Sequence, residues 1–187
     1  MEAMVFVLCG ILLASAAVVL RRRYAEFYGQ SIDDYEDGMP ELDIRKHLNG
    51  KMVCEGVIFG PLGRVTSTFF ADFDIRWENG RGVMDEVFHY DDGSVQNRQW
   101  VITMGENGQF RAAADDVPDG GRGVQGGPAV QMRYAIRLPE ESGGHLLDTV
   151  DWMYLTPNKV IVNRSQFRKF GFKVAELVAT IRPKEAA

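Results

Sequence analysis

The stretch that decides the fold runs from residue 65 to residue 77 and reads VTSTFFADFDIRW. Every second residue is apolar or small: Val65, Ser67, Phe69, Ala71, Phe73, Ile75 and Trp77. The residues between them are mostly polar and include Thr66, Thr68, Asp72, Asp74 and Arg76. Because successive side chains of a strand point to opposite faces, this alternation predicts one long β-strand with a single apolar face.

The same period of two begins before this strand, at Lys51, and continues over most of the chain that follows. Residues 84–90 and 96–104 alternate around an Asp-Asp-Gly-Ser turn, and aspartate-glycine between two alternating runs is typical of a hairpin. Further strands are expected at 110–114, 130–138, 145–155, 159–163 and 171–182. About nine consecutive strands with short connections predict an all-β fold, an up-and-down antiparallel barrel that closes and leaves no exposed edge.

Two features of this prediction leave alternatives open. A two-sheet sandwich would also accommodate the strands. The glycine-rich stretch 116–128 shows no clear alternation and is expected to be a loop, either a lid at the barrel mouth or a flexible surface loop.

A different pattern fills the amino terminus. Residues 3–20 form an uncharged apolar run of 18 residues, followed by the three arginines at 21–23. As a helix this run is about 27 Å long and has no polar stripe, so we expect one transmembrane helix. A cleaved signal peptide is the alternative, but it would carry its positive charge before the apolar run. A lipoprotein signal would place a small residue, and not Leu8, before Cys9.

The sequence divides into three parts. Residues 1–23 are the expected anchor with its arginine flank, residues 24–39 are an acidic linker without Lys or Arg, and residues 40–187 are the expected barrel domain. Cationic flanks tend to stay in the cytoplasm, so the arginines favour a cytoplasmic barrel. Beyond residue 23, 18 Lys and Arg stand against 25 Asp and Glu. This acidic balance disfavours binding to nucleic acid and lying flat on anionic lipid.

Polar and aromatic residues in the predicted strands are candidate ligand contacts. The candidates are Glu86, Arg98, Trp100, Asp115, Asp151, Trp152, Asn163 and Arg164. Glu86 and Arg98 lie on neighbouring strands of the expected hairpin and are predicted to pair. If several candidates point inward, they form a polar cluster inside an apolar cup, which suits the headgroup of a ligand. The alternative is that they face solvent, where cross-strand charge pairs are common.

These patterns predict a membrane-tethered barrel that binds a hydrophobic or amphipathic small molecule, such as a lipid or fatty-acid derivative. A first alternative is an isomerase or hydratase for a lipid-like substrate. Its acids or bases would be Glu86, Asp115 and Asp151, and its charge stabilisers would be Arg98 and Arg164. A second alternative is a non-catalytic accessory protein that docks a partner at the membrane.

Neither a cofactor nor a metal ion is expected. The glycine-rich stretch matches no phosphate-binding pattern, because no helix is predicted after it. The histidines at 47, 89 and 145 stand alone, without a second histidine or a cysteine at ligand spacing. Cys54 has no partner inside the predicted domain, so no internal disulfide is expected.

Several blocks resemble a known family in the same order along the chain. They are LNGK at 48–51, FHYDDG at 88–93 with Arg98 and Trp100, ADDV at 114–117, DWMYL at 151–155, VNRS at 162–165 and KFG at 169–171. From about residue 43 to residue 182 the chain resembles the bacterial DUF3833 family, whose members are uncharacterised and often membrane-anchored or lipoprotein-like. The resemblance implies a lipocalin-like barrel at the bacterial inner membrane and brings no activity with it. Many relatives look periplasmic, whereas the arginines favour the cytoplasm, so the sequence leaves the side of the membrane open.

Overall fold

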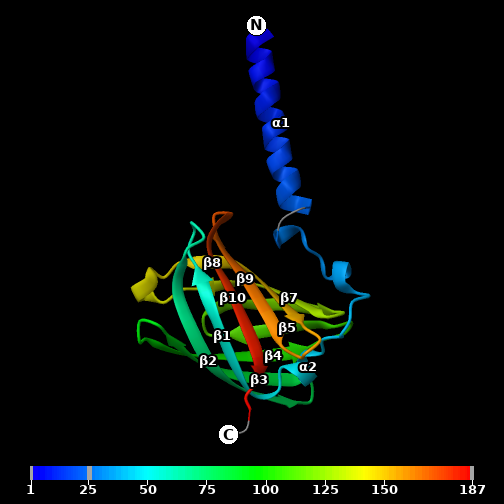
Figure 1. Ribbon diagram of the computed structural model, residues 1–187, viewed down its shortest axis with the longest axis vertical. Coiled ribbons are helices and arrows are strands. Elements are labelled where there is room, and N and C mark those ends of the chain that lie inside the picture. Colours follow the sequence, from blue (N-terminus) through cyan, green and yellow to red (C-terminus); the bar gives the residue numbers. More distant parts are fainter. Residues whose placement is uncertain (1, 25–26, 186–187) are drawn as a thin grey trace. The chain divides into compact units, whose positions relative to one another are not determined.

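The computed structural model describes residues 2–24 and 27–185 (Figure 1). These residues form two compact units, divided after Asp34. The first unit contains one long helix, α1 (Glu2–Tyr24), and a short 3-10 helix, η1 (Phe27–Gly29). A second 3-10 helix, η2 (Ile32–Tyr35), runs across the division.

Helix α1 has the length and composition of a membrane-spanning segment. Its apolar part, Glu2–Arg21, is 20 residues long, has a mean hydropathy of 2.8 and is not buried. A helix of 20 residues is about 30 Å long, which matches the hydrocarbon core of a bilayer. The helix is therefore compatible with a membrane anchor and also with a signal sequence.

The second unit is a closed antiparallel barrel in which each strand pairs with the next and the last pairs with the first (Figure 1). The strands are β1 (Gly50–Phe59), β2 (Val65–Glu78), β3 (Arg81–Tyr90), β4 (Val95–Met104), β5 (Gln109–Ala114), β6 (Val117–Gly126), β7 (Ala129–Arg137), β8 (Leu146–Leu155), β9 (Ile161–Lys169) and β10 (Phe172–Pro183). The prediction of a closed all-β barrel is confirmed, with ten strands in place of about nine, and the sandwich alternative is wrong.

The strand that the sequence did not indicate is β6, which occupies most of the glycine-rich stretch. It pairs with β5 on one side and β7 on the other, so the prediction of a loop at 116–128 is wrong. A Cβ atom on Gly123 would lie 2.0 Å from the ring of Phe110 on β5. Glycine at this position lets the aromatic ring pack directly on the neighbouring backbone. The glycines of this stretch therefore mark close packing within a strand.

The segment before β1 closes one end of the barrel. Helix α2 (Ile44–His47) begins after Asp43, whose side chain accepts a hydrogen bond from the Arg45 backbone N–H at 3.0 Å. Ile44 and Leu48 are almost fully buried in the core. The Trp77 indole N–H donates to the Leu48 carbonyl at 2.8 Å and holds the end of this segment against β2.

The connections of an up-and-down barrel alternate between its two ends. The end opposite α2, which we call the mouth, carries the connections β1–β2, β3–β4, β5–β6, β7–β8 and β9–β10. The β7–β8 connection is the longest of these and contains a 3-10 helix, η3 (Glu140–Ser142). The two ends of the barrel therefore differ, because the segment of α2 covers one of them.

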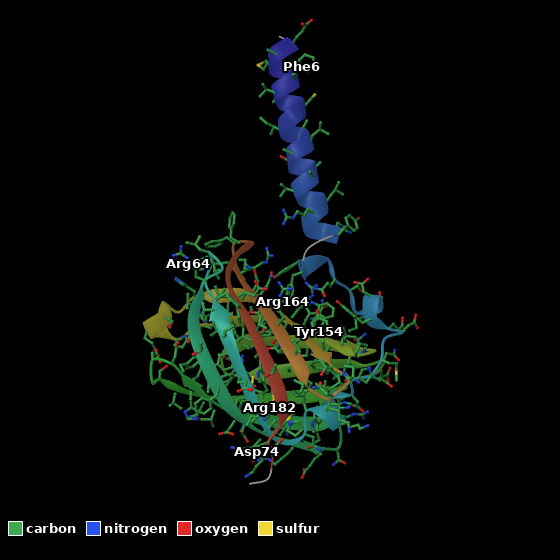
Figure 2. All side chains as sticks on the ribbon, in the orientation of Figure 1. Phe6, Arg64, Asp74, Tyr154, Arg164 and Arg182 are labelled. Atoms are coloured by element: carbon green, nitrogen blue, oxygen red, sulfur yellow. The ribbon has the colours of Figure 1, made fainter. Side chains whose placement is uncertain are left out.

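The outer surface of β8 is covered by the beginning of the second unit. Trp152 on β8 has an exposed fraction of 0%. The Tyr35 ring lies 5.5 Å from Trp152 and 5.5 Å from Tyr154, edge-on to both, and Tyr154 is labelled in Figure 2. Farther along, the Leu42 backbone N–H donates to the Gly127 carbonyl at 2.8 Å. Trp152 is thus a packing residue on the outside of the barrel.

We expect the Trp152→Ala substitution to lower the free energy of unfolding by about 3–5 kcal/mol, because it leaves a cavity beneath the Tyr35 ring. Denaturant unfolding of the full-length protein, followed by circular dichroism, measures the change. Phe70→Ala is the control, because Phe70 is 57% exposed on the outside of β2 and its loss should cost less than about 1 kcal/mol. Equal losses for the two variants would contradict the packing role of Trp152.

Candidate functional site

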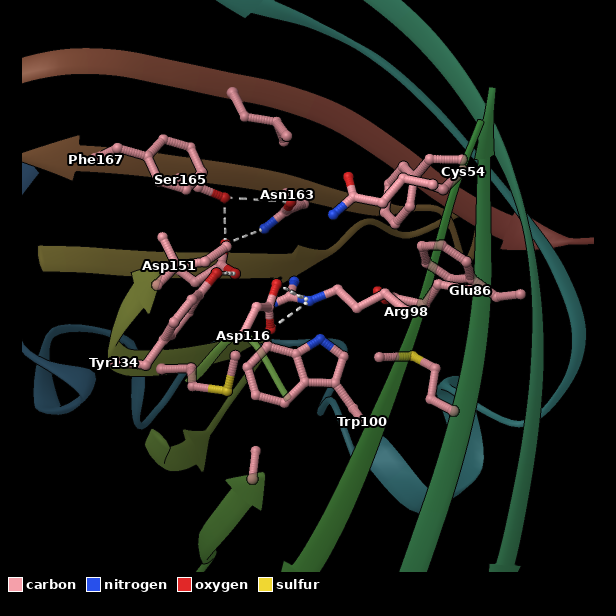
Figure 3. Close-up of a pocket in the computed structure, with 18 of the residues that line it drawn as sticks. Cys54, Glu86, Arg98, Trp100, Asp116, Tyr134, Asp151, Asn163, Ser165 and Phe167 are labelled. Atoms are coloured by element: carbon pink, nitrogen blue, oxygen red, sulfur yellow. Dashed lines mark hydrogen bonds and ion pairs between the residues drawn. The ribbon is translucent and has the colours of Figure 1, made fainter. Parts of the chain in front are cut away.

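A cavity of about 330 Å³ lies inside the barrel. It reaches from the α2 segment to the β7–β8 connection at the mouth, and its walls are the inward-facing side chains of the strands (Figure 3). Most of the lining is apolar and includes Phe69, Phe73, Met84, Phe88, Trp100, Phe110, Met132 and Leu177. The Phe88 ring centroid lies 5.5 Å from that of Phe69 and 5.8 Å from that of Phe73, so the three form one aromatic surface.

Asp151 on β8 is the best-satisfied polar group of this cavity. Its Oδ1 accepts hydrogen bonds from the Ser165 hydroxyl and, at 2.6 Å, from the Asn163 amide, both on the neighbouring strand β9. Its Oδ2 accepts a hydrogen bond from the Tyr134 hydroxyl at 3.3 Å. Burial raises the pKa of the Asp151 carboxyl above its usual value, while these three hydrogen bonds act in the opposite direction. Asp151 therefore organises donors from β7 and β9 around one carboxylate.

Arg98 on β4 carries a buried positive charge of the site, and a second lining cation, Arg137, lies exposed at the mouth. Its Nε lies 2.9 Å from Asp116 Oδ2, and its Nη2 donates to Asp116 Oδ1 at 3.0 Å. The guanidinium carbon also lies 4.3 Å from the centroid of the Trp100 ring, which is a favourable cation–π distance. Only 15% of the Arg98 side chain is exposed, so its charge is held in place by Asp116 and Trp100.

Glu86 on β3 is the buried carboxyl without a complete set of partners. It lies opposite Arg98 in the β3–β4 register, as predicted, but the ion pair of Arg98 is with Asp116. Glu86 is 5% exposed, and its Oε2 atom has no hydrogen-bond partner among the described residues. Burial, and then the negative charges of Asp151 and Asp116, raise the pKa of Glu86 to about 8, against the opposing effect of Arg98. At neutral pH Glu86 is therefore mostly protonated and can donate a hydrogen bond into the cavity.

The cavity also contains a cysteine, but not one suited to chemistry. Cys54 on β1 lines the wall and is 4% exposed. Burial, with the nearby negative charge of Glu86 adding to it, raises the pKa of the Cys54 thiol to about 12. A thiol that remains protonated at neutral pH is a poor nucleophile and a poor metal ligand. Across the described residues, no three His, Cys, Asp or Glu side chains are placed to hold a metal ion.

The model of the DUF3833 family, described as a protein of unknown function, matches residues 24–183. The chain belongs to this family. The match covers most of the chain and confirms the family that the sequence blocks predicted. Comparison of the sequence with curated proteins gives no match.

Two solved structures share the fold. An S-type phycobiliprotein lyase, CPES from Guillardia theta, has a TM-score of 0.55 and 9% identity, over 76% of this chain and 91% of that chain. A protein of unknown function from the DUF3598 family of Nostoc punctiforme has a TM-score of 0.54 and 11% identity, over 78% of this chain and 50% of that chain. At such low identity the likeness concerns the fold alone.

In this DUF3833 chain, five of the eight candidate residues line the cavity: Glu86, Arg98, Trp100, Asp151 and Asn163. The other three do not. Asp115 is exposed at the β5–β6 turn, and Trp152 is packed beneath Tyr35. Arg164 is 46% exposed and lies 2.6 Å from Glu176 on the outer surface. The proposed acid–base set of the enzyme alternative is therefore not assembled as predicted, because Asp115 and Arg164 are absent from the cavity.

Three residues of the site were not among the eight candidates. Asp116, and not its neighbour Asp115, reaches Arg98 from the β5–β6 turn that the two residues form. Ser165 lies two residues after Asn163, on the same face of β9, and Tyr134 belongs to the alternating apolar face of β7. The period-two pattern could have predicted both Ser165 and Tyr134. Each lies two residues after a residue that faces the interior, Asn163 and Met132 respectively, and so faces the interior too.

We expect the stability of the protein to fall as the pH rises from about 5 to about 8, partly through Glu86. Its carboxyl has a pKa of about 8 in the folded protein, against an ordinary value of 4.5, so in this range the folded state binds more protons than the unfolded state. The free energy of unfolding then falls by at most about 1.4 kcal/mol per pH unit from this group.

The Glu86→Gln variant should show a flatter dependence of the unfolding free energy on pH over this range. Urea unfolding at a series of pH values measures it. Glu55→Gln is the matched control, because Glu55 is 58% exposed on the outside of β1 and should leave the wild-type slope unchanged. A Glu86→Gln slope as steep as that of the wild type would contradict a buried, protonated Glu86.

Proposed function

We propose that this protein is a membrane-tethered barrel that binds one hydrophobic or amphipathic small molecule, a lipid or fatty-acid derivative, in its interior. The observation that carries the proposal is the cavity, in which an apolar wall surrounds a few polar groups. One of those groups, the Glu86 carboxyl, has an oxygen without a partner among the described residues. Small-molecule sites are mostly apolar with a few placed polar groups that orient the ligand.

The size of the cavity supports a small ligand with a single chain. Its volume of about 330 Å³ is at the lower end of the usual range for small-molecule sites, about 300–1,000 Å³. The aromatic surface of Phe69, Phe73 and Phe88 suits the apolar part of such a molecule. The fold shared with a phycobiliprotein lyase supports the same use, since a barrel of this kind has room for one small ligand.

The charges of the site support a headgroup that is uncharged. Inside the cavity Arg98 is already paired with Asp116, and Asp151 is a second acid, while the other lining cation, Arg137, is exposed at the mouth. A free carboxylate on the ligand would add a negative charge beside these two, which is unfavourable in a buried site. A hydroxyl, ester or amide group would instead accept a hydrogen bond from protonated Glu86.

The tether is the remaining part of the proposal. Helix α1 has the composition of a span, and the sequence around it lacks the order of charges that a cleaved signal would show. The sequence resemblance described above implies a position at a bacterial inner membrane, and many relatives look periplasmic. The arginines at 21–23 support the cytoplasmic side for the barrel. A protein that keeps its barrel near a bilayer would find a lipid-like ligand there in quantity.

Ligand binding is testable by photolabelling the full-length protein in nanodiscs with a monoacylglycerol that carries a diazirine in its acyl chain. We expect label on peptides of the barrel interior. Ala112→Phe should reduce this label at least tenfold, because Ala112 is buried and lines the cavity. Ala113→Phe is the matched control, because Ala113 is exposed on the opposite face of β5 and should leave the label unchanged.

Circular dichroism shows whether the Ala112→Phe variant folds. If it does not fold, Leu177→Trp replaces it, because Leu177 lines the cavity at a less buried position. Equal labelling of the Ala112→Phe and Ala113→Phe variants would refute binding in the cavity. A separate experiment tests the prediction that the headgroup is uncharged. The fatty acid with the same diazirine chain should label the interior several-fold less than the monoacylglycerol at neutral pH. Stronger labelling by the fatty acid would refute an uncharged headgroup.

A further inference from the structure

We propose that two hairpin tips at the barrel mouth insert into the surface of an anionic phospholipid bilayer. The tips carry three large apolar side chains that the protein leaves in solvent. Leu62 in the β1–β2 connection and Phe170 in the β9–β10 turn are each 87% exposed, and Phe172, at the start of β10, is 69% exposed. We call these three residues the tip cluster.

The two hairpins of the tip cluster adjoin each other. Strands β1 and β10 are paired as far as Phe59 and Glu176, and both tips lie beyond this last pair, at the mouth. Figure 1 shows the β1–β2 and β9–β10 hairpins at the same end of the barrel. The cluster is therefore a single feature built from the first and the last hairpin, and not two unrelated loops.

The backbone of Phe170 makes its presence at the turn informative. Phe170 has a φ of 51° and Gly171 a φ of 79°, so both turn residues are left-handed. Asparagine or glycine is preferred at such a position, and a bulky aromatic residue there is unfavourable. The same residue exposes most of its ring, and its neighbour Lys169 places Nζ 5.6 Å from the ring centroid. The side chain of Phe170 is unfavourable both in its backbone conformation and in its exposure to solvent. A contact made outside the described protein explains why it is there.

The charges around the cluster identify the partner. Segments 60–64 and 168–173 contain Arg64, Arg168, Lys169 and Lys173 and no acidic residue, in a domain that is acidic overall. Of these cations, Lys173 is paired with Glu176. Figure 2 labels Arg64 at the β1–β2 tip. Apolar and aromatic side chains flanked by cations are the pattern that binds the interface of an anionic membrane.

The neighbouring connections limit this contact to the two tips. Asp91 and Asp92 lie in the β3–β4 turn, and Glu140 and Glu141 lie in the β7–β8 connection, one on each side of the cluster. Anionic lipid repels these acids, so the barrel does not lie flat on the surface. The tips bring the mouth of the cavity toward the bilayer, which gives a lipid-like ligand a direct route inside. The route rests on the proposed function, whereas the contact of the tips does not.

Tryptophan quenching in vesicles tests the contact on the full-length protein. Phe170→Trp is reconstituted into phosphatidylcholine–phosphatidylglycerol vesicles whose phosphatidylcholine carries bromine on its acyl chains. The native Trp77, Trp100 and Trp152 provide the same background in every variant. We expect the added tryptophan of Phe170→Trp to be quenched at least twofold. Glu106→Trp is the matched control, because the β4–β5 turn lies at the opposite end of the barrel, and its added tryptophan should not be quenched.

Three results would overturn the proposal or a part of it. Equal quenching of the Phe170→Trp and Glu106→Trp variants overturns the contact, and Leu62→Trp repeats the test if Phe170→Trp does not fold. The role of anionic lipid is overturned if quenching of Phe170→Trp is unchanged when phosphatidylglycerol is omitted. It is also overturned if quenching is unchanged when Arg64→Gln and Lys169→Gln are added to that variant. Photolabelling of the cavity by the diazirine monoacylglycerol separates the two proposals. If the cavity is still labelled but the added tryptophan at the tip is not quenched, only the membrane contact of the tips is overturned.

Discussion

The pairing of β1 with β10 is the constraint on which the rest of the structure depends. It joins residues that are more than 100 positions apart, from Met52 with Pro183 to Phe59 with Glu176. Closure satisfies the backbone of the first and last strands and removes both edges of the sheet. It also divides every strand into an outer face and an inner face, so that side chains with a period of two are gathered in one interior. The cavity and its polar groups exist because of this division.

The polar groups of the interior differ in how many hydrogen-bond and ion-pair partners the closed barrel places around them. Asp151 has donors on both neighbouring strands, and Arg98 has Asp116 and the Trp100 ring. Glu86 faces the same space, but its second oxygen has no partner among the described residues. In a low-dielectric interior the uncharged form of such a carboxyl is favoured. In the proposed function, a protonated acid beside a held ion pair is the point of attachment for a polar headgroup, and the phenylalanine surface contacts an apolar chain.

The two ends of the barrel have different chemistry. At one end Ile44 and Leu48 are buried and Trp77 holds the α2 segment in place. At the other end the tip cluster exposes large apolar side chains among cations. A cavity that is covered at one end and bordered by membrane-directed tips at the other is consistent with exchange of a ligand through the mouth. The acidic surface of the remaining protein is then turned to water.

The sequence by itself determined the class of the fold and much of the site. The alternation from Val65 to Trp77 and its repetition predicted a closed antiparallel barrel, because side-chain period follows directly from strand geometry. The same pattern placed Glu86, Arg98, Trp100, Asp151 and Asn163 among the candidates, and all five line the cavity.

Only the tertiary structure decided the rest. It showed β6 as a strand, in which Gly123 accommodates the ring of Phe110 across the sheet, and local sequence propensity does not predict that contact. It placed Trp152 and Arg164 outside, because which face of an alternating strand is inward depends on register and closure. It also showed that Asp116 reaches Arg98 from the β5–β6 turn. The hydrogen bonds of Tyr134 and Ser165 to Asp151 join the consecutive strands β7, β8 and β9, and they depend on the register in which these strands pair.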